Sequence, residues 1–157
     1  DGLQVTYGQD YGFSIDPTTL VGIAIDKKRK IIYVKEHLYK PKLTTSQIAY
    51  INLEICGKSL IVADSAEPRL IDELYKNGCN VVGAEKGPGS ISLGIALLQD
   101  YQIIVENDSI NVGKEFNNYV YADKGSKLYV DNFNHAIDSI RYNVTYQLGR
   151  STGYEIR

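Results

Sequence analysis

The sequence predicts an α/β fold in which a mixed sheet, with three antiparallel strands first and parallel strands after them, is flanked by helices. Residues 3–38 contain β-rich runs joined by short turns, a pattern typical of an antiparallel meander. Residues 44–105 then alternate helical apolar periods with short strand-like runs, which is typical of parallel crossovers. With 157 residues, 43% of them hydrophobic and 23% charged, the chain matches one globular domain.

The antiparallel strands are expected at residues 3–11, 20–25 and 31–38. Asp16 precedes Pro17, a pair that favours a turn between the first strand and the second. The basic run 27–30 lies between two alternating apolar segments, which indicates a solvated hairpin turn.

In the crossover part, apolar residues three or four apart predict helices, and glycine or proline marks their ends. Helices are expected at 44–56, from Pro68 to 77–78, and from Pro88 onward, the last with Ile91, Ile95 and Leu98 facing inward. Short strands are expected at 60–63, 80–84 and 102–105. The run 60–63 is wholly apolar, as expected for a central strand that is buried on both faces.

A β-hairpin and a helix are expected at the end of the chain. Residues 119–122 and 127–130 flank a turn sequence at 123–126. A helix over 132–148 would bury a stripe of apolar residues, Phe133, Ile137, Ile140, Val144 and Leu148. Antiparallel strands, then helix-linked strands, then a terminal helix is the order of an RNase H-like fold.

Three aspartates that are far apart in the sequence lie where regular structure would hold a carboxylate still. Asp10 follows the first strand between Gly8 and Gly12, which would let a phosphate or a neighbouring strand approach the backbone. Asp64 follows the central strand, at the edge where open α/β sheets present functional groups, and Asp138 lies on the terminal helix. Such oxygen ligands suit Mg²⁺ better than Zn²⁺, so converging aspartates would form a site for a hard divalent cation.

Each aspartate also has an ordinary structural explanation. Asp10 could be a turn or cap residue, and Asp64 or Ser65 could be the N-cap of the helix that follows. Asp138 and Arg141 are spaced for a surface ion pair on one helix.

Other polar residues accompany these aspartates. His135 lies three residues before Asp138 on the same helix face, where it is either a site residue or a structural histidine. Asp131 would continue that face if the helix began early. Lys86 precedes a helix N-terminus whose free amides favour phosphate, so it is either a DNA-backbone contact or part of a plain turn.

Four ordered motifs extend over most of the chain. They are Gly8-x-Asp10-Tyr11-Gly12 with Asp16-Pro17; Ala63-Asp64-Ser65-Ala66-Glu67-Pro68; Lys86-Gly87-Pro88-Gly89-Ser90-Ile91; and Asp131-x-x-Asn134-His135-Ala136-Ile137-Asp138-Ser139-Ile140-Arg141-Tyr142. Together they resemble the C-terminal nuclease domain of tailed-bacteriophage terminase large subunits.

The resemblance implies a metal-dependent endonuclease that cuts concatemeric double-stranded DNA during genome packaging. It implies Mg²⁺ or Mn²⁺ as cofactor, with two ions in the active complex. Asp10, Asp64 and Asp138 would be the metal ligands, with His135 as a catalytic residue beside the last of them. Asp131 either joins the metal shell or merely begins the helix. The resemblance also assigns DNA contacts to lysines, namely Lys86, Lys124 and Lys127.

The resemblance further implies that residues 1–157 are a single nuclease domain excised from a larger protein with an N-terminal packaging ATPase domain. The expected partners are double-stranded DNA, that ATPase domain, the terminase small subunit and the portal protein. The expected location is the host cell cytoplasm, with transient attachment at the procapsid portal. The chain begins without Met, as expected of an excised domain.

Bulk properties narrow the function classes. The net charge of −2 excludes a wholly basic DNA-binding surface but allows a local one. Cys56 and Cys79 lack metal-ligand spacing and indicate buried thiols in a reducing compartment. No apolar run reaches the ~18 residues of a membrane span, so we expect no membrane partner.

Other functions remain open at this point. An actin-like ATPase has a similar first glycine-aspartate motif, but it would need a second domain and a second glycine-rich loop. Another RNase H-like nuclease, such as a junction resolvase, would also hold metal ions with carboxylates, but it does not explain the 134–142 motif. A non-catalytic module that docks on DNA or the portal would keep the aspartates as structural residues.

Overall fold

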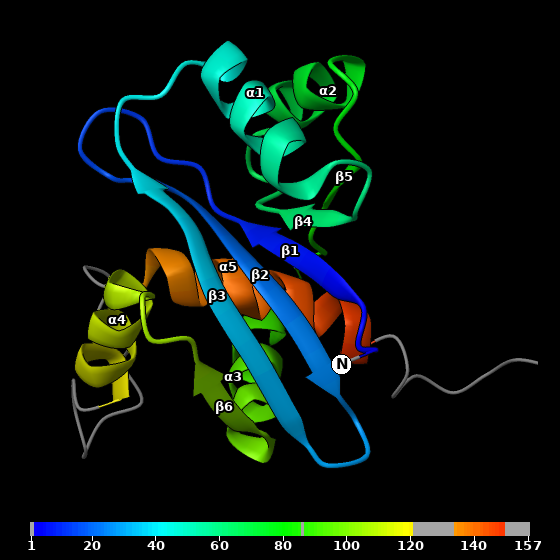
Figure 1. Cartoon of the computed structure of the whole chain (residues 1–157), viewed down its shortest axis with the longest axis vertical. Helices are drawn as coiled ribbons and strands as arrows, with labels where there is room; N and C mark the ends of the chain where they lie inside the picture. Colours follow the sequence, from blue (N-terminus) through cyan, green and yellow to red (C-terminus); the bar gives the residue numbers. More distant parts are fainter. Residues whose placement is uncertain (1, 86, 121–133, 150–157) are drawn as a thin grey trace, which may run out of the picture.

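The computed structural model describes residues 2–85, 87–120 and 134–149, which form one mixed sheet with helices on both faces (Figure 1). The strands are β1 (Val5–Gln9), β2 (Thr18–Asp26), β3 (Ile31–Lys40), β4 (Ile61–Ala63), β5 (Val81–Gly83) and β6 (Gln102–Val105). The helices are α1 (Thr45–Cys56), α2 (Pro68–Lys76), α3 (Ser90–Asp100), α4 (Ile110–Val120) and α5 (His135–Val144), which continues as the π-helical turn η1 (Thr145–Gly149).

The sheet has the strand order β5-β4-β1-β2-β3-β6. β1, β2 and β3 pair antiparallel, whereas β4 is parallel to β1 and β5 is parallel to β4. The predicted mixed sheet, with its antiparallel meander and parallel crossovers, is therefore confirmed. β6 joins the opposite edge, parallel to β3, so the chain between β5 and β6 crosses the whole sheet.

The helices lie in two layers (Figure 1). α1 and α2 pack on one face at the β4–β5 end of the sheet, where the core includes Ile48, Leu74 and Ile61. α3, α4 and α5 pack on the other face, where the core includes Ile137 and Ile140. The four residues of the predicted terminal stripe that the structure describes, Ile137, Ile140, Val144 and Leu148, are all buried.

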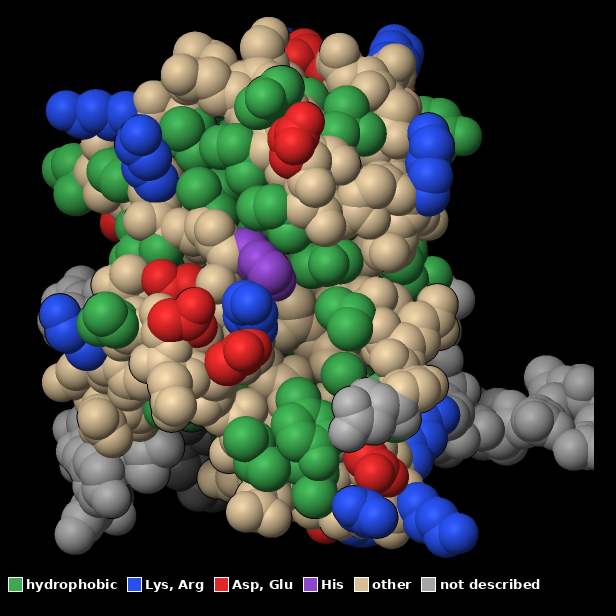
Figure 2. Space-filling model, in the orientation of Figure 1, with side chains coloured by type: hydrophobic (Ala, Val, Ile, Leu, Met, Phe, Trp, Pro, Cys, Tyr) green, Lys and Arg blue, Asp and Glu red, His purple; other side chains and the backbone are tan. Residues whose placement is uncertain are grey.

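Part of the sheet is not covered by helices. On the α1–α2 side, the far ends of β2 and β3 form a shallow hollow of about 400 Å³, lined by residues that include Tyr7, Gly22, Tyr33, His37 and Ile104. Figure 2 shows a histidine side chain (purple) on this face, with hydrophobic side chains above it and charged side chains directly below it. Among the described residues, no helix is long and apolar enough to cross a membrane.

α4 was not predicted, and it replaces the start of the predicted hairpin. Residues 119 and 120 complete the last turns of α4 instead of beginning a strand; residues 121–130 lie outside the described residues. Glu36 of β3 explains where α4 begins. Its carboxylate accepts hydrogen bonds from the Val112 amide at 2.9 Å and from Asn111 Nδ2 at 2.8 Å. A strand that is distant in sequence therefore caps this helix.

α4 in turn supports α5. Glu115 of α4 is 1% exposed, and its carboxylate accepts hydrogen bonds from the Ile137 amide at 2.9 Å and from Tyr39 Oη at 2.7 Å. Asn134, at the N-cap of α5, makes no side-chain cap bond. Glu115 thus satisfies a free amide at the start of α5 from a neighbouring helix, and its negative charge favours the positive end of the helix dipole.

Two details of α3 differ from the prediction. The helix begins at Ser90, and Pro88 lies in the preceding turn because Gly89 takes the N-cap position with φ 80°. Ile91, expected in the core, is 51% exposed, whereas Gly94, Ile95 and Leu98 face inward. Both cysteines are free and buried, as expected.

α5 lies directly on β1 because Gly8 has no side chain. A Cβ atom at Gly8 would come within 1.9 Å of the Ser139 carbonyl oxygen. The close approach anticipated at Gly8 is therefore made by a helix. At Gly12 the close neighbour is the Asp16 carbonyl oxygen, which belongs to the turn that follows.

Gly8→Ala should lower the free energy of unfolding by about 3 kcal/mol, because the added methyl group forces α5 away from β1. The measurement is urea unfolding. Gly113→Ala is the matched control: a Cβ there meets nothing within 4 Å, so it should stabilise helix α4 by about 0.5–1 kcal/mol. Equal stability of Gly8→Ala and the parent would contradict the close contact.

Glu115→Ala should destabilise the fold by about 2–3 kcal/mol, because the Ile137 amide and the Tyr39 hydroxyl lose a charged acceptor inside the protein. Glu115→Gln retains one acceptor oxygen and should cost less. Urea unfolding measures both variants. Parent-like stability of the alanine variant would show that this cap is not needed.

Candidate active site

Two of the predicted aspartates lie side by side. Asp10 and Asp64 directly follow β1 and β4, which are adjacent parallel strands with Gln9 opposite Ala63. The Asp64 amide donates to the Gln9 carbonyl at 3.1 Å, so the pairing of the two strands continues as far as Asp64. Gln9 is buried and exchanges side-chain hydrogen bonds with Asn52 of α1, each 2.9 Å long. The two aspartates therefore leave the sheet at one edge, as predicted.

Thr19 of β2 holds Asp10 in place. The Asp10 amide donates to Thr19 Oγ1 at 3.1 Å, and the Thr19 amide donates to the Asp10 carbonyl at 2.9 Å. The Thr19 hydroxyl also contacts Ser139 Oγ and the His135 carbonyl of α5. One fully buried threonine thus ties the first aspartate to the terminal helix.

Asp64 has a local role as well. Its Oδ1 accepts a hydrogen bond from the Ala66 amide at 2.9 Å, which closes a short turn before α2. Glu67 is the N-cap of α2, so neither Asp64 nor Ser65 takes that position. The turn fixes one oxygen of Asp64 and orients its carboxylate.

His135 lies between two carboxylates. Its Nδ1 is 3.6 Å from Asp10 Oδ2, and its Nε2 is 3.6 Å from Asp16 Oδ1. The interaction with Asp10 raises the pKa of His135, burial partly lowers it, and the charge of Asp16 adds to the rise. The sequence suggested Asp16 only as a turn residue, and its contact with His135 was not anticipated.

Asp138 is paired with Arg141 but lies in an unfavourable setting for a negative charge. Arg141 Nη2 is 3.2 Å from Asp138 Oδ1. Burial raises the pKa of Asp138 to about 6, Arg141 opposes the rise, and the charge of Asp10 adds to it. The ion pair expected on the surface is mostly buried, since the side chains of Arg141 and Asp138 are 10% and 19% exposed.

Tyr142 is influenced by three of the predicted metal ligands. Burial is the largest cause that raises the pKa of its hydroxyl, and the charges of Asp10, Asp138 and Asp64 raise it further. These three carboxylates are therefore near enough to one phenol for their charges to act on it.

The donor chemistry fits a hard divalent cation. All the converging groups are carboxylates, and Asp10 is only 7% exposed, which makes uncompensated negative charge costly. Within residues 2–85, 87–120 and 134–149, however, no three His, Cys, Asp or Glu side chains are close enough to form a ready metal site. The carboxylates would have to move closer together around an ion.

The remaining predicted site residues lie outside the described residues; they are Asp131, Lys86, Lys124 and Lys127. Thr19 and Ser139, which join β2 to α5 at the site, were missed because nothing in their local sequence distinguishes them from other buried polar residues.

The family model for the terminase RNase H-like domain matches residues 10–145, a span that contains Asp10, Asp64, His135 and Asp138. The chain belongs to this family. Relatives of this terminase domain include the large terminase subunit of Bacillus phage SPP1, 33% identical over 147 residues, which cover 88% of this chain and 35% of that protein. The PBSX phage terminase large subunit of Bacillus subtilis is 33% identical over 141 residues, 86% of this chain and 33% of that protein.

The terminase domain also has a solved relative. The nuclease domain of the SPP1 large terminase, crystallised with bound Mn, has a TM-score of 0.77 and 28% identity over 92% of this chain and 86% of that one. The RNase H-like fold predicted from the order of elements is therefore confirmed. This chain spans about a third of the length of the curated relatives it matches, and it corresponds to the nuclease part of a terminase large subunit.

Asp138→Asn should stabilise the terminase domain in EDTA at pH 8 by about 2–3 kcal/mol. The folded-state pKa, about 6, lies above the ordinary 3.8, so ionised Asp138 lowers stability at high pH and this cost disappears below pH 3.8. Urea unfolding at pH 8 and pH 4 should therefore show a much larger gain at pH 8 than at pH 4. An equal gain at both values would contradict this origin.

Proposed function

We propose that this terminase domain is a metal-dependent endonuclease that hydrolyses phosphodiester bonds of double-stranded DNA. The observation that carries the proposal is the placement of Asp10 and Asp64 side by side after the paired strands β1 and β4, with Asp138 on α5, the helix that packs on both strands. The 28% identical SPP1 nuclease domain that contains Mn supports the same chemistry here.

Asp10, Asp64 and Asp138 would hold Mg²⁺ or Mn²⁺, two ions in the active complex. When bound, such ions supply a water activated for attack and stabilise the charge on the leaving oxygen. The protein restrains two of these ligands, because Thr19 holds the Asp10 backbone and the turn to Ala66 holds one oxygen of Asp64.

His135 acts in this proposal as a positioning residue. Both of its ring nitrogens face carboxylates, Asp10 on one side and Asp16 on the other. The ring therefore keeps the Asp10 carboxylate oriented, and its raised pKa retains a proton between the two acids.

Membership of the terminase family supports a proposed biological role. The domain would cut concatemeric DNA during packaging and would work with an N-terminal ATPase domain, the terminase small subunit and the portal in the host cytoplasm. That the chain spans about a third of its relatives supports such a larger protein. Asp131 as a further ligand, and Lys86, Lys124 and Lys127 as DNA contacts, remain predictions.

Supercoiled-plasmid cleavage with Mg²⁺, Mn²⁺ or EDTA tests the proposal. The parent should cut with metal and not with EDTA, whereas Asp10→Asn and Asp64→Asn should lose at least about a hundredfold in rate, equal to about 2.7 kcal/mol of transition-state stabilisation. Circular dichroism should show an intact fold in both variants.

Asp72→Asn provides the control, since Asp72 is exposed on α2 and pairs there with Lys76. It should cut like the parent. Parent-like cutting by the Asp10 and Asp64 variants would show that the site is wrongly assigned. If the parent binds DNA but does not cut it with either Mg²⁺ or Mn²⁺, that result would favour a docking module.

A further inference from the structure

The loop between β1 and β2 presents two large apolar side chains to solvent beside the candidate active site. Phe13 is 64% exposed and Ile15 is 86% exposed, the highest value among the large hydrophobic residues in the described part of the chain. The loop starts directly after Asp10, so the Cα atom of Phe13 lies within about 11 Å of the Cα atom of Asp10. Ile15 precedes Asp16, whose Oδ1 is 3.6 Å from His135 Nε2. Both apolar residues are therefore close to the proposed metal site.

Hydrogen bonds at the base of this loop hold its shape. The Thr18 hydroxyl donates to the Gly12 carbonyl at 3.3 Å and accepts from the Gly12 amide at 3.2 Å. A Cβ atom at Gly12 would lie 2.0 Å from the Asp16 carbonyl oxygen, so the chain folds back tightly on itself. Because the loop is already ordered, it loses little conformational entropy when a partner binds to it.

Two lysines lie next to the loop. Figure 1 shows the loop beyond the end of the sheet, beside the chain that leads from β3 to α1. Lys40, the last residue of β3, is paired with Thr18 at the base of the loop. The Lys42 amide donates to the Phe13 carbonyl at 3.1 Å, and Lys42 makes this bond at a φ of 62°, which few non-glycine residues adopt. The backbone thus joins exposed positive charge to the apolar loop.

The charges of this surface favour an anion. Neither Lys40 nor Lys42 forms a salt bridge with another described residue. Asp16 is the opposing charge in the loop, and its carboxylate faces His135. Two exposed lysines beside two exposed apolar side chains suit a partner that has both phosphates and an apolar surface, as duplex DNA does in its grooves.

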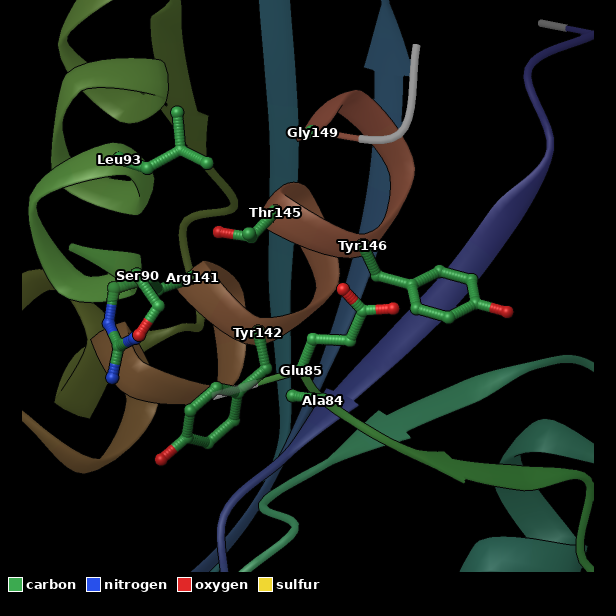
Figure 3. A pocket seen from close by; sticks show the side chains of 9 residues that line it. All are labelled: Ala84, Glu85, Ser90, Leu93, Arg141, Tyr142, Thr145, Tyr146 and Gly149. Carbon is green, nitrogen blue, oxygen red and sulfur yellow. The ribbon is translucent and has the colours of Figure 1, made fainter. Parts of the chain in front are cut away.

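The cavity of about 210 Å³ between α3 and α5 is less suited to such a partner (Figure 3). Its lining includes Glu85, Arg141 and Thr145. Arg141 Nε and Thr145 Oγ1 are buried, and Arg141 Nη2 is already paired with Asp138. The Glu85 carboxylate adds negative charge to the wall. The accessible positive charge beside the site is therefore that of Lys40 and Lys42.

We propose that Phe13, Ile15, Lys40 and Lys42 form a contact surface for double-stranded DNA beside the phosphodiester that is cut. This rests on the proposed nuclease function, which brings a duplex to Asp10. The grooves of B-DNA are about 6 and 12 Å wide, so a loop within about 11 Å of the cut strand reaches a groove. There the apolar side chains contact sugars and base edges, and the lysines contact phosphates.

Fluorescence anisotropy of a labelled duplex in EDTA, at several salt concentrations, tests the lysines without cleavage. The double variant Lys40→Gln/Lys42→Gln should weaken binding about tenfold and reduce the slope of log K against log salt by about 1.8, the value for two lost phosphate contacts. Lys27→Gln/Lys28→Gln is the matched control. It removes the same charge from the exposed turn at the opposite end of β2, and it should leave the slope unchanged.

The apolar residues are tested by the double variant Phe13→Ala/Ile15→Ala in the same assay. It should weaken binding about tenfold with an unchanged salt slope, because the lost contacts are not ionic. Its melting temperature should equal that of the parent, since both side chains are exposed, whereas a structural role would lower it. Tyr75→Ala removes a side chain that is 66% exposed near the end of α2, and it should bind DNA like the parent.

Parent-like affinity of Phe13→Ala/Ile15→Ala would overturn the proposal and assign the apolar pair to another partner, such as a protein. A parent-like salt slope of the Lys40 and Lys42 variant would also overturn it, as would a parent that does not bind DNA at low salt. If Phe13→Ala/Ile15→Ala does not fold, Ile15→Ala alone decides.

The same measurements separate this surface from the nuclease. A parent that cuts DNA while every variant binds like it rejects only the surface. A parent and variants that bind as expected, without cleavage in Mg²⁺ or Mn²⁺, reject only the nuclease.

Discussion

The site depends on how closely α5 lies against β1. Gly8 lets the backbone at Ser139 approach, Thr19 joins Asp10 to the same turn of the helix, and Glu115 satisfies the amide of Ile137 at its start. These contacts come from β1, β2 and α4, so no single element determines the position of α5. Together the contacts keep His135 and Asp138 of α5 close to Asp10.

The same placement makes the site electrostatically costly. Asp138 is buried near Asp10, and the Arg141 ion pair offsets this only in part, as the pKa of about 6 shows. Buried like charges lower stability, and a protein keeps them where a function needs them. A divalent cation would offset this repulsion directly, which is why a structure without a ready three-ligand cluster still has the electrostatics of a cation site.

How far the sequence could predict this depends on the range of each interaction. The six strands of the sheet, the four described residues of the stripe on α5 and η1, and the positions of Asp10 and Asp64 follow from local periodicity and from the ends of strands, and these predictions were confirmed. α4 was missed because Gly113, Asn117 and Asn118 weaken its helical signal. Its start is set by Glu36 on a distant strand, a contact that no local pattern reports.

Arg141 shows the same limit at the site. Beside Asp138 it has the spacing of a surface ion pair, and only the packing against Gly94 of α3 buries it. Once buried, its Nη2 donates to Asp138, a proposed metal ligand, while its Nε has no hydrogen-bond partner among the described residues. The pair offsets only part of the cost of burying the Asp138 carboxylate, so this carboxylate would still be stabilised by a cation.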